Sequence, residues 1–155
     1  MSIMDAQLLF SESQSIIGNA GTSTESTNIV YIPMVRNPAN TLVDDAPNVS
    51  GSLYLNLVCE DQNLLAAADS CGLTVALYAD TDDTTVTSDG DVILTKTFTI
   101  TQTAVAYADG DQMWCQPLPV TAFNQYLAVK YTKATQNLST GKVTCWIGPP
   151  CQQGK

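Results

Sequence analysis

Short segments in which apolar and polar residues alternate recur along the chain. Leu53, Leu55 and Leu57 alternate with Tyr54 and Asn56, and this period of two places the leucines on one face of a β-strand. Similar patterns mark further segments at residues 7–10 extended toward 17, 28–32, 73–79, 94–100, 127–131 and 143–147. The pattern therefore predicts seven or eight short strands.

The segment from residue 94 to residue 100 sorts its side chains by type. Leu94, Phe98 and Ile100 share one face with Lys96, and Thr95, Thr97 and Thr99 occupy the other. Threonine suits a pleated, half-buried surface. We expect a strand with an apolar face and a threonine ladder.

Turn-forming residues separate these strands and leave little room for helices. They lie at residues 18–21, 46–48, 50–51, 89–90, 109–110, 116–117 and 140–141. The one helical pattern, Asp61–Asp69, is too short to bury much surface. Many short strands without crossover helices predict an all-β fold, an antiparallel, jelly-roll-like β-sandwich.

Length and composition indicate one domain, spanning residues 1–155. The chain has a mass of 16.5 kDa, and 45% of its residues are hydrophobic, which suits a single globular core. No apolar run approaches the roughly 20 residues of a membrane span, so we expect no membrane partner. The segment Met1–Asp5 lacks the features of a secretory signal. We therefore expect a protein that is made and kept in the cytoplasm, unless an assembly carries it out.

The charged residues exclude several function classes. Histidine is absent, so catalytic triads and imidazole-bound metals are excluded. Six basic against fifteen acidic residues give a net charge of −9. This charge has the wrong sign for phosphate backbones, and we expect no nucleic-acid partner.

Five cysteines, at positions 59, 71, 115, 145 and 151, show no metal-site spacing. Cys59 and Cys145 fall within predicted strands, where a small buried hydrophobic residue is the favoured interpretation. Disulfides between Cys59 and Cys71, or between Cys145 and Cys151, remain alternatives.

Clustered carboxylates suggest calcium binding as an alternative. Residues 80–83 and 89–91 supply five aspartates, and calcium prefers oxygen ligands. Their spacing does not fit the twelve-residue calcium loop, so turns capped by the Asp side chains are the favoured interpretation. The adjacent pairs Asp44–Asp45 and Glu60–Asp61 do not form a matched acid and base, because neighbours on a strand point to opposite faces.

Residues 139–142 resemble a phosphate loop only superficially. Position 136 is Gln and position 143 is Val, where the loop needs Gly and a Ser or Thr. We predict no catalytic residue, no metal and no cofactor, and hence a protein that is not an enzyme.

Two tryptophans, Trp114 and Trp146, are the largest candidates for contact. Core packing is one interpretation, and a binding surface is the other, because Trp is enriched in protein–protein hot spots. Trp146 alternates with Cys145, so one of the two should face outward.

Four segments carry a resemblance that covers most of the chain: residues 4–14, 73–80, 125–132 and 140–144. In their order and spacing they resemble the jelly-roll capsid cement proteins of short-tailed phages, of the Bordetella-phage type. The cysteines and Met113–Gln116 depart from that pattern.

The resemblance implies a structural protein of the virion that acts by binding alone. Its expected partners are a major capsid protein of HK97 fold and a second copy, in a homodimer. Its expected location is the capsid exterior, where it would stabilise the shell. We predict shell contacts through Asp5, Gln7 and Phe10, with Trp114 as an anchor.

Two other functions remain open. One is a calcium-assisted carbohydrate-binding β-sandwich, suggested by the acidic loop and the aromatic side chains. The other is a different virion role, such as a head-to-tail or spike component.

Overall fold

The computed structural model describes residues 8–32, 53–60, 70–101, 107–119, 124–138 and 140–150. The predicted helix at Asp61–Asp69 and the turns at 46–48 and 50–51 lie outside these ranges. The described elements are one short helix, α1 (Val86–Asp89), and nine strands. The strands are β1 (Leu9–Ser15), β2 (Ser23–Glu25), β3 (Val30–Tyr31), β4 (Tyr54–Cys59), β5 (Ser70–Asp80), β6 (Asp91–Thr101), β7 (Gln112–Pro117), β8 (Tyr126–Ala134) and β9 (Lys142–Gly148).

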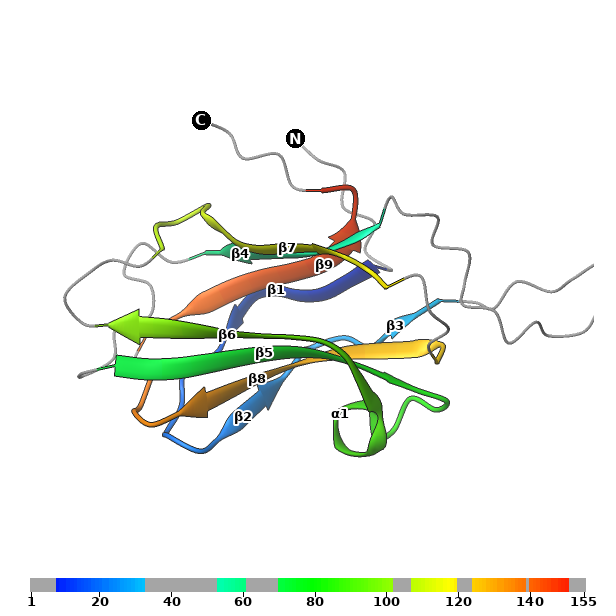
Figure 1. Cartoon of the computed structure of the whole chain (residues 1–155), viewed down its shortest axis with the longest axis horizontal. Helices are drawn as coiled ribbons and strands as arrows, with labels where there is room; N and C mark the ends of the chain where they lie inside the picture. The colour runs from blue at the N-terminus through cyan, green and yellow to red at the C-terminus, as the bar shows by residue number, and fades with distance from the viewer. Residues whose placement is uncertain are drawn as a thin grey trace, which may run out of the picture.

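The strands form two antiparallel sheets that face each other (Figure 1). One sheet has the order β1-β9-β4-β7, and the other has the order β2-β8-β5-β6, with β3 also paired to β8. Because β2 and β3 share one neighbour, they occupy one strand position. The result is the two-sheet arrangement of a jelly roll, so the predicted fold class is confirmed.

The core lies between the sheets, where the alternating apolar residues meet. Leu55 and Leu57 of β4 and Leu73, Val75 and Leu77 of β5 are fully buried. In β6, Thr97 is exposed while Phe98 and Ile100 are buried, and Thr97 bonds to Thr74 of β5 (Oγ1 to Oγ1, 2.9 Å). The predicted two-faced strand is therefore confirmed.

The alternation did not predict strands β2 and β7, and the turn predicted at residues 116–117 is part of β7. β2 contains no apolar residue, and β7 includes Gln116 and Pro117, which the sequence analysis assigned to a turn. That assignment is wrong, because the two residues pair with Leu55 and Tyr54 of β4. Proline is tolerated there because β7 is an edge strand, whose outer side needs no N–H donor.

Glycines in the left-handed region make two of the predicted turns. Gly21 has φ of 77° and Gly110 has φ of 83°, a conformation that glycine adopts without steric cost. At residues 89–90 the chain instead leaves the short helix α1. In the described part of the chain, no helix is long and apolar enough to cross a bilayer.

Candidate partner-binding site

The predicted contact residues divide between the core and the undescribed part of the chain. Asp5 and Gln7 lie outside the described residues. Phe10 is fully buried in β1, and Trp114 of β7 is only 5% exposed. Neither aromatic ring is therefore presented on the surface of the isolated chain, and shell contact through these residues stays a prediction.

Hydrogen bonds close one long side of the sandwich. The backbone N–H of Asn28 donates to Phe10 O (2.9 Å), and Asn28 Nδ2 donates to Leu9 O (3.1 Å). Gln14 Nε2 donates to Glu25 O at 2.5 Å. Since β1 ends one sheet and β2 ends the other, these bonds join the two sheets along this side.

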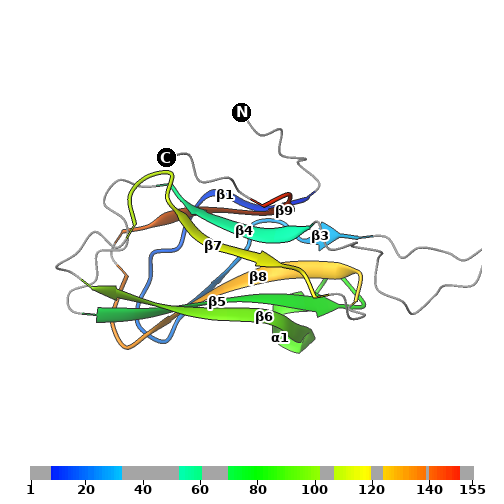
Figure 2. The same ribbon diagram turned by 45° about the horizontal axis from the view of Figure 1, so that its top comes forward.

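The opposite side, between β6 and β7, is open. These two strands end their sheets (Figure 2), and no strand among the described residues pairs with the outer edge of either. A cavity of about 600 Å³ lies here, lined by residues 94–96 of β6 and 112–116 of β7. Unpaired strand edges can accept an additional strand, so this open side is the candidate binding site.

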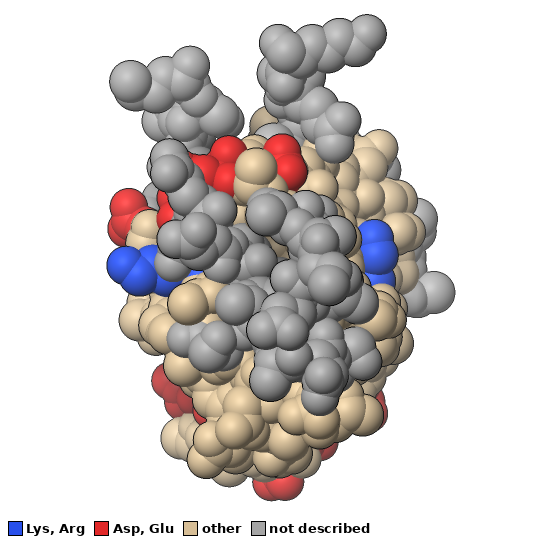
Figure 3. Space-filling view, turned by 90° about the vertical axis from the view of Figure 1, so that its left-hand side faces the viewer, with Lys and Arg blue, Asp and Glu red and all other residues tan. Residues whose placement is uncertain are grey.

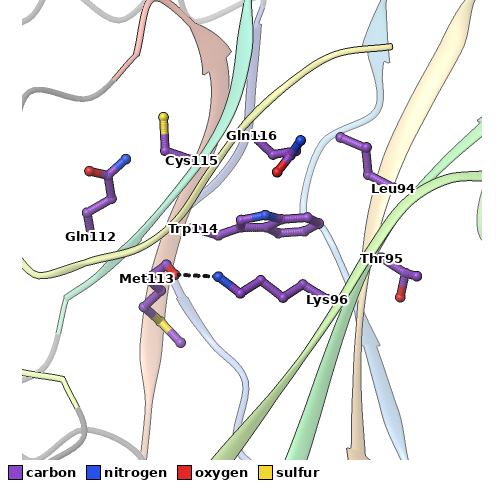
Figure 4. A pocket seen from close by; sticks show the side chains of 8 residues that line it. All are labelled: Leu94, Thr95, Lys96, Gln112, Met113, Trp114, Cys115 and Gln116. Atoms are coloured by element: carbon purple, nitrogen blue, oxygen red, sulfur yellow. Dashed lines mark hydrogen bonds between the residues drawn. The ribbon is translucent and has the colours of Figure 1, made fainter.

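Lys96 extends from β6 toward β7 across this gap (Figure 4). Its Nζ donates to the backbone oxygen of Met113 at 3.5 Å and lies 4.9 Å from the centroid of the Phe98 ring. Good N–H···O bonds measure roughly 2.7–3.2 Å. The bond to Met113 is therefore long, and the exposed ammonium group keeps capacity for a better acceptor.

Trp114 approaches the same gap from β7. Its indole points toward β6 beside Lys96, whereas Cys115 and Gln112 point away (Figure 4). Trp114 pairs with Leu57 of β4, and the register shifts before the next pair, so Met113 is an extra, bulged residue. With this bulge in β7, the indole of Trp114 lies between the two sheets and forms an apolar side of the gap.

One donor beside the gap has no acceptor. Gln112 Nε2 is buried and has no hydrogen-bond partner among the described residues, a condition that carries a desolvation cost. Its amide lies on the far side of β7 from Lys96 in Figure 4. Gln112 borders the cavity, but its side chain does not point toward Lys96.

The charge of the open side contrasts with that of the whole molecule. The chain has six Lys and Arg residues against fifteen Asp and Glu. In the end-on view of Figure 3, acidic side chains show at the top, on the left and at the bottom, and basic ones on the left and right. Lys96 thus supplies a scarce positive charge to a gap that is otherwise lined by apolar and uncharged residues.

The acidic loop after β5 is organised by hydrogen bonds within the chain. Asp82 Oδ1 accepts from Thr84 N and Thr84 Oγ1, both at 2.9 Å, and these bonds lower the pKa of Asp82. Asp80 Oδ1 accepts from Thr81 N at 2.5 Å. The favoured interpretation of capped turns is confirmed. Within the described ranges, no group of three or more Cys, Asp or Glu side chains could hold a metal ion.

The interior holds Tyr131, which the alternation places on an inward strand face, and two polar residues that the alternation did not identify, Ser11 and Lys133. Tyr131 Oη lies 3.1 Å from Ser11 Oγ, which also donates to Gln14 Oε1 at 2.5 Å. Burial raises the pKa of Tyr131 well above its usual value. Lys133 is 1% exposed and donates to Thr24 Oγ1 at 2.7 Å. One more step of the alternation beyond residue 131 would have placed Lys133 on this inward face.

No disulfide joins the described cysteines to one another: Cys59, Cys71 and Cys145 are buried, and Cys115 is half-buried. The interpretation of Cys59 and Cys145 as small buried residues is thus confirmed. Cys145 faces the core and Trp146 is half-buried on the outer face, as the alternation predicted. Cys151 lies outside the described residues.

In comparisons with known proteins, no family model matches this chain, and no curated protein sequence matches it.

Proposed function

We propose that this protein is a capsid decoration protein that binds the outside of a phage shell of HK97 fold and stabilises it without catalysing a reaction. It would act in several copies, as homodimers, at the virion exterior. The proposal starts from the resemblance of four sequence segments to cement proteins, and the fold adds physical support.

The observation that carries the proposal is where those four segments lie. The segments at residues 4–14 and 140–144 contribute to β1 and β9, which pair with each other. The segments at 73–80 and 125–132 contribute to β5 and β8, which also pair. Segments far apart in the sequence thus form neighbouring strands of a jelly roll, the fold that the resemblance implies.

The charge and the open side fit binding to a large protein surface. An acidic protein is repelled by DNA, so the exterior of a DNA-filled shell suits its charge of −9. The open edges of β6 and β7 offer backbone groups to a partner. Repetition by shell symmetry lets modest interfaces add to a large stabilisation.

Attachment to shells tests this proposal directly. The purified protein is mixed with expanded, undecorated capsids of the phage that carries its gene, and bound protein is measured by sedimentation. We expect binding that saturates at a fixed number of copies per shell, and decorated shells that resist heat better. Absence of saturable attachment would overturn the proposal. Tryptophan quenching by sugars that a chelator abolishes would support the carbohydrate-binding alternative instead.

A further inference from the structure

We propose that β6 binds an extended segment of the shell protein as an added β-strand. We further propose that this segment carries an Asp or Glu with a large apolar residue two positions before it and another two positions after it. The inference rests on the proposed function and names the contact through which the shell is recognised.

Of the two open edges, β6 is the better template for an added strand. Both strands carry a bulge, at Ile93 in β6 and at Met113 in β7. Beyond its bulge, β6 continues from Leu94 to Thr101 without proline, whereas β7 ends four residues beyond its bulge at Pro117. A bulge interrupts the regular spacing of backbone donors and acceptors, and proline removes a donor. A regular ladder of backbone hydrogen bonds can therefore form along residues 94–101 of β6.

The side chains of β6 determine what the added strand must carry. Residues directly opposite each other on paired strands point to the same face. A strand added to β6 would place alternate side chains beside Leu94 and Lys96, which line the gap, and beside Phe98, which is buried on the same face of β6 and packs edge-on against Tyr107. Apolar partners suit Leu94 and Phe98, and an acidic partner suits Lys96. The intervening positions lie beside Thr95 and Thr97, which face outward and tolerate polar neighbours.

An acidic partner for Lys96 follows from its present contacts. The ammonium makes a 3.5 Å bond to Met113 O and stands over the Phe98 ring, and no carboxylate lies within ion-pair distance among the described residues. An added strand would remove water from the gap beside Trp114. A covered ammonium without an anionic partner is costly, whereas a charge-assisted hydrogen bond to a carboxylate compensates for the lost water.

The occupant is a different protein rather than a second copy. None of the fifteen Asp and Glu residues of this chain has Val, Ile, Leu, Met, Phe, Tyr or Trp at both flanking positions two residues away. A second copy therefore cannot supply the side-chain pattern that β6 requires. A homodimer, if it forms, would use another surface.

Charge reversal at Lys96 separates this inference from the proposed function. Lys96→Glu is compared with Lys142→Glu, which makes the same charge change at an exposed residue of the other sheet. We expect Lys96→Glu to weaken attachment to undecorated capsids by about tenfold or more, since it opposes two carboxylates in a covered site, and Lys142→Glu to bind like the unaltered protein. Circular dichroism melts would establish that both variants fold.

Each outcome of this comparison is informative. If the unaltered protein and Lys96→Glu attach equally well, the strand-addition inference is overturned and the decoration function stands. If the unaltered protein does not attach, the decoration function fails, and the inference fails with it. If Lys96→Glu and Lys142→Glu weaken attachment equally, the effect is one of overall charge, and a specific role for Lys96 is contradicted.

Cross-linking identifies the shell segment. Decorated capsids are treated with a carbodiimide, which joins an amine directly to a nearby carboxylate, and the linked peptides are sequenced by mass spectrometry. We expect a link from Lys96 to an acidic residue of the shell protein that has large apolar residues two positions to either side. A link from Lys96 to a residue without such neighbours, or links from other lysines alone, would overturn the proposed pattern.

Discussion

Three ionisable side chains of this protein occupy inward-facing positions on their strands. Lys96 reaches the open gap, Lys133 is buried at the end of β8, and Cys145 lies in the core beside Tyr131. Each follows from strand alternation, which assigns a face without regard to polarity. Burial then disfavours the charged form of any ionisable group.

Cys145 is predicted to make stability fall at alkaline pH. Burial raises its pKa to about 12, and a hydrogen bond with Tyr131 opposes that shift. The thiol therefore stays protonated in the folded state at pH values where it is already ionised in the unfolded chain. Its contribution to the free energy of unfolding is complete below about pH 8.5 and is lost as the pH rises toward 12. We expect Cys145→Ala to reduce the slope of unfolding free energy between pH 9 and 10 by about 1.4 kcal/mol per pH unit.

Urea titrations at several pH values measure this slope. Cys115→Ala, which removes a half-buried thiol, is the matched control. An unchanged slope in Cys145→Ala would contradict the assignment.

Lys133 is predicted to make the stability of the fold rise at alkaline pH. Desolvation lowers its pKa, and the nearby Cys71 opposes this shift. The unfolded chain therefore holds the proton more tightly, and the cost of the buried ammonium disappears as the pH rises toward the ordinary lysine value of about 10.4. We expect Lys133→Met to raise the free energy of unfolding by about 1 kcal/mol at pH 7. This gain should shrink at pH 10, and a gain that is equal at both pH values would contradict the titration of Lys133.

At the scale of elements, strands that lack a clear alternation depend on their neighbours. β2 has the sequence Ser-Thr-Glu and is a strand because it pairs with residues 130–132 of β8. β7 is a strand because it pairs with β4. Local propensity for these segments is weak, so pairing and burial decide their conformation.

The junction between α1 and β6 is predicted to require glycine for steric reasons. Gly90 has an ordinary φ of −69°, but a Cβ there would overlap Val86 O and come within 2.7 Å of Ala79 O. Because both are backbone atoms, they cannot move aside cheaply. We expect Gly90→Ala to lower the free energy of unfolding by about 2 kcal/mol or more.

Gly72→Ala is the matched control in β5, where a new Cβ would meet Ala134 Cβ at 3.6 Å, an ordinary contact. Denaturant melts of the two variants should differ clearly. Equal stability would show that the α1 junction relaxes without penalty.

At the scale of the whole molecule, the two sheets share one hydrophobic core. Residues from both sheets, including Leu57 of β4 and Leu77 of β5, belong to one buried cluster. Neither sheet could bury its inner face alone. The sandwich should therefore behave as one cooperative unit.

We predict a single unfolding transition for the full chain. Tryptophan fluorescence reports on the sheet that holds Trp114 and Trp146, and far-ultraviolet circular dichroism reports on both sheets. The two probes should give the same midpoint in a urea titration. Two separate transitions would show that the sheets, or a second domain, unfold independently.

The sequence by itself determined the class of fold and many of the residues that face the core. The alternation in β4, β5, β6, β8 and β9 identified inward side chains such as Leu57 and Phe98. It also required Cys145 and Trp146 to lie on opposite faces of their strand. These properties are local, because the period of two depends only on the geometry of an extended backbone.

Only the tertiary structure decided which strands are neighbours and which edges stay open. The pairing of Leu9 with Trp146 joins opposite ends of the chain, and the burial of Trp114 depends on β6 facing β7. Alternation states which face of a strand is apolar but not which strand lies beside it. Strand pairing depends on side-chain complementarity summed over the whole sandwich, so the open side and its lysine became visible only in three dimensions.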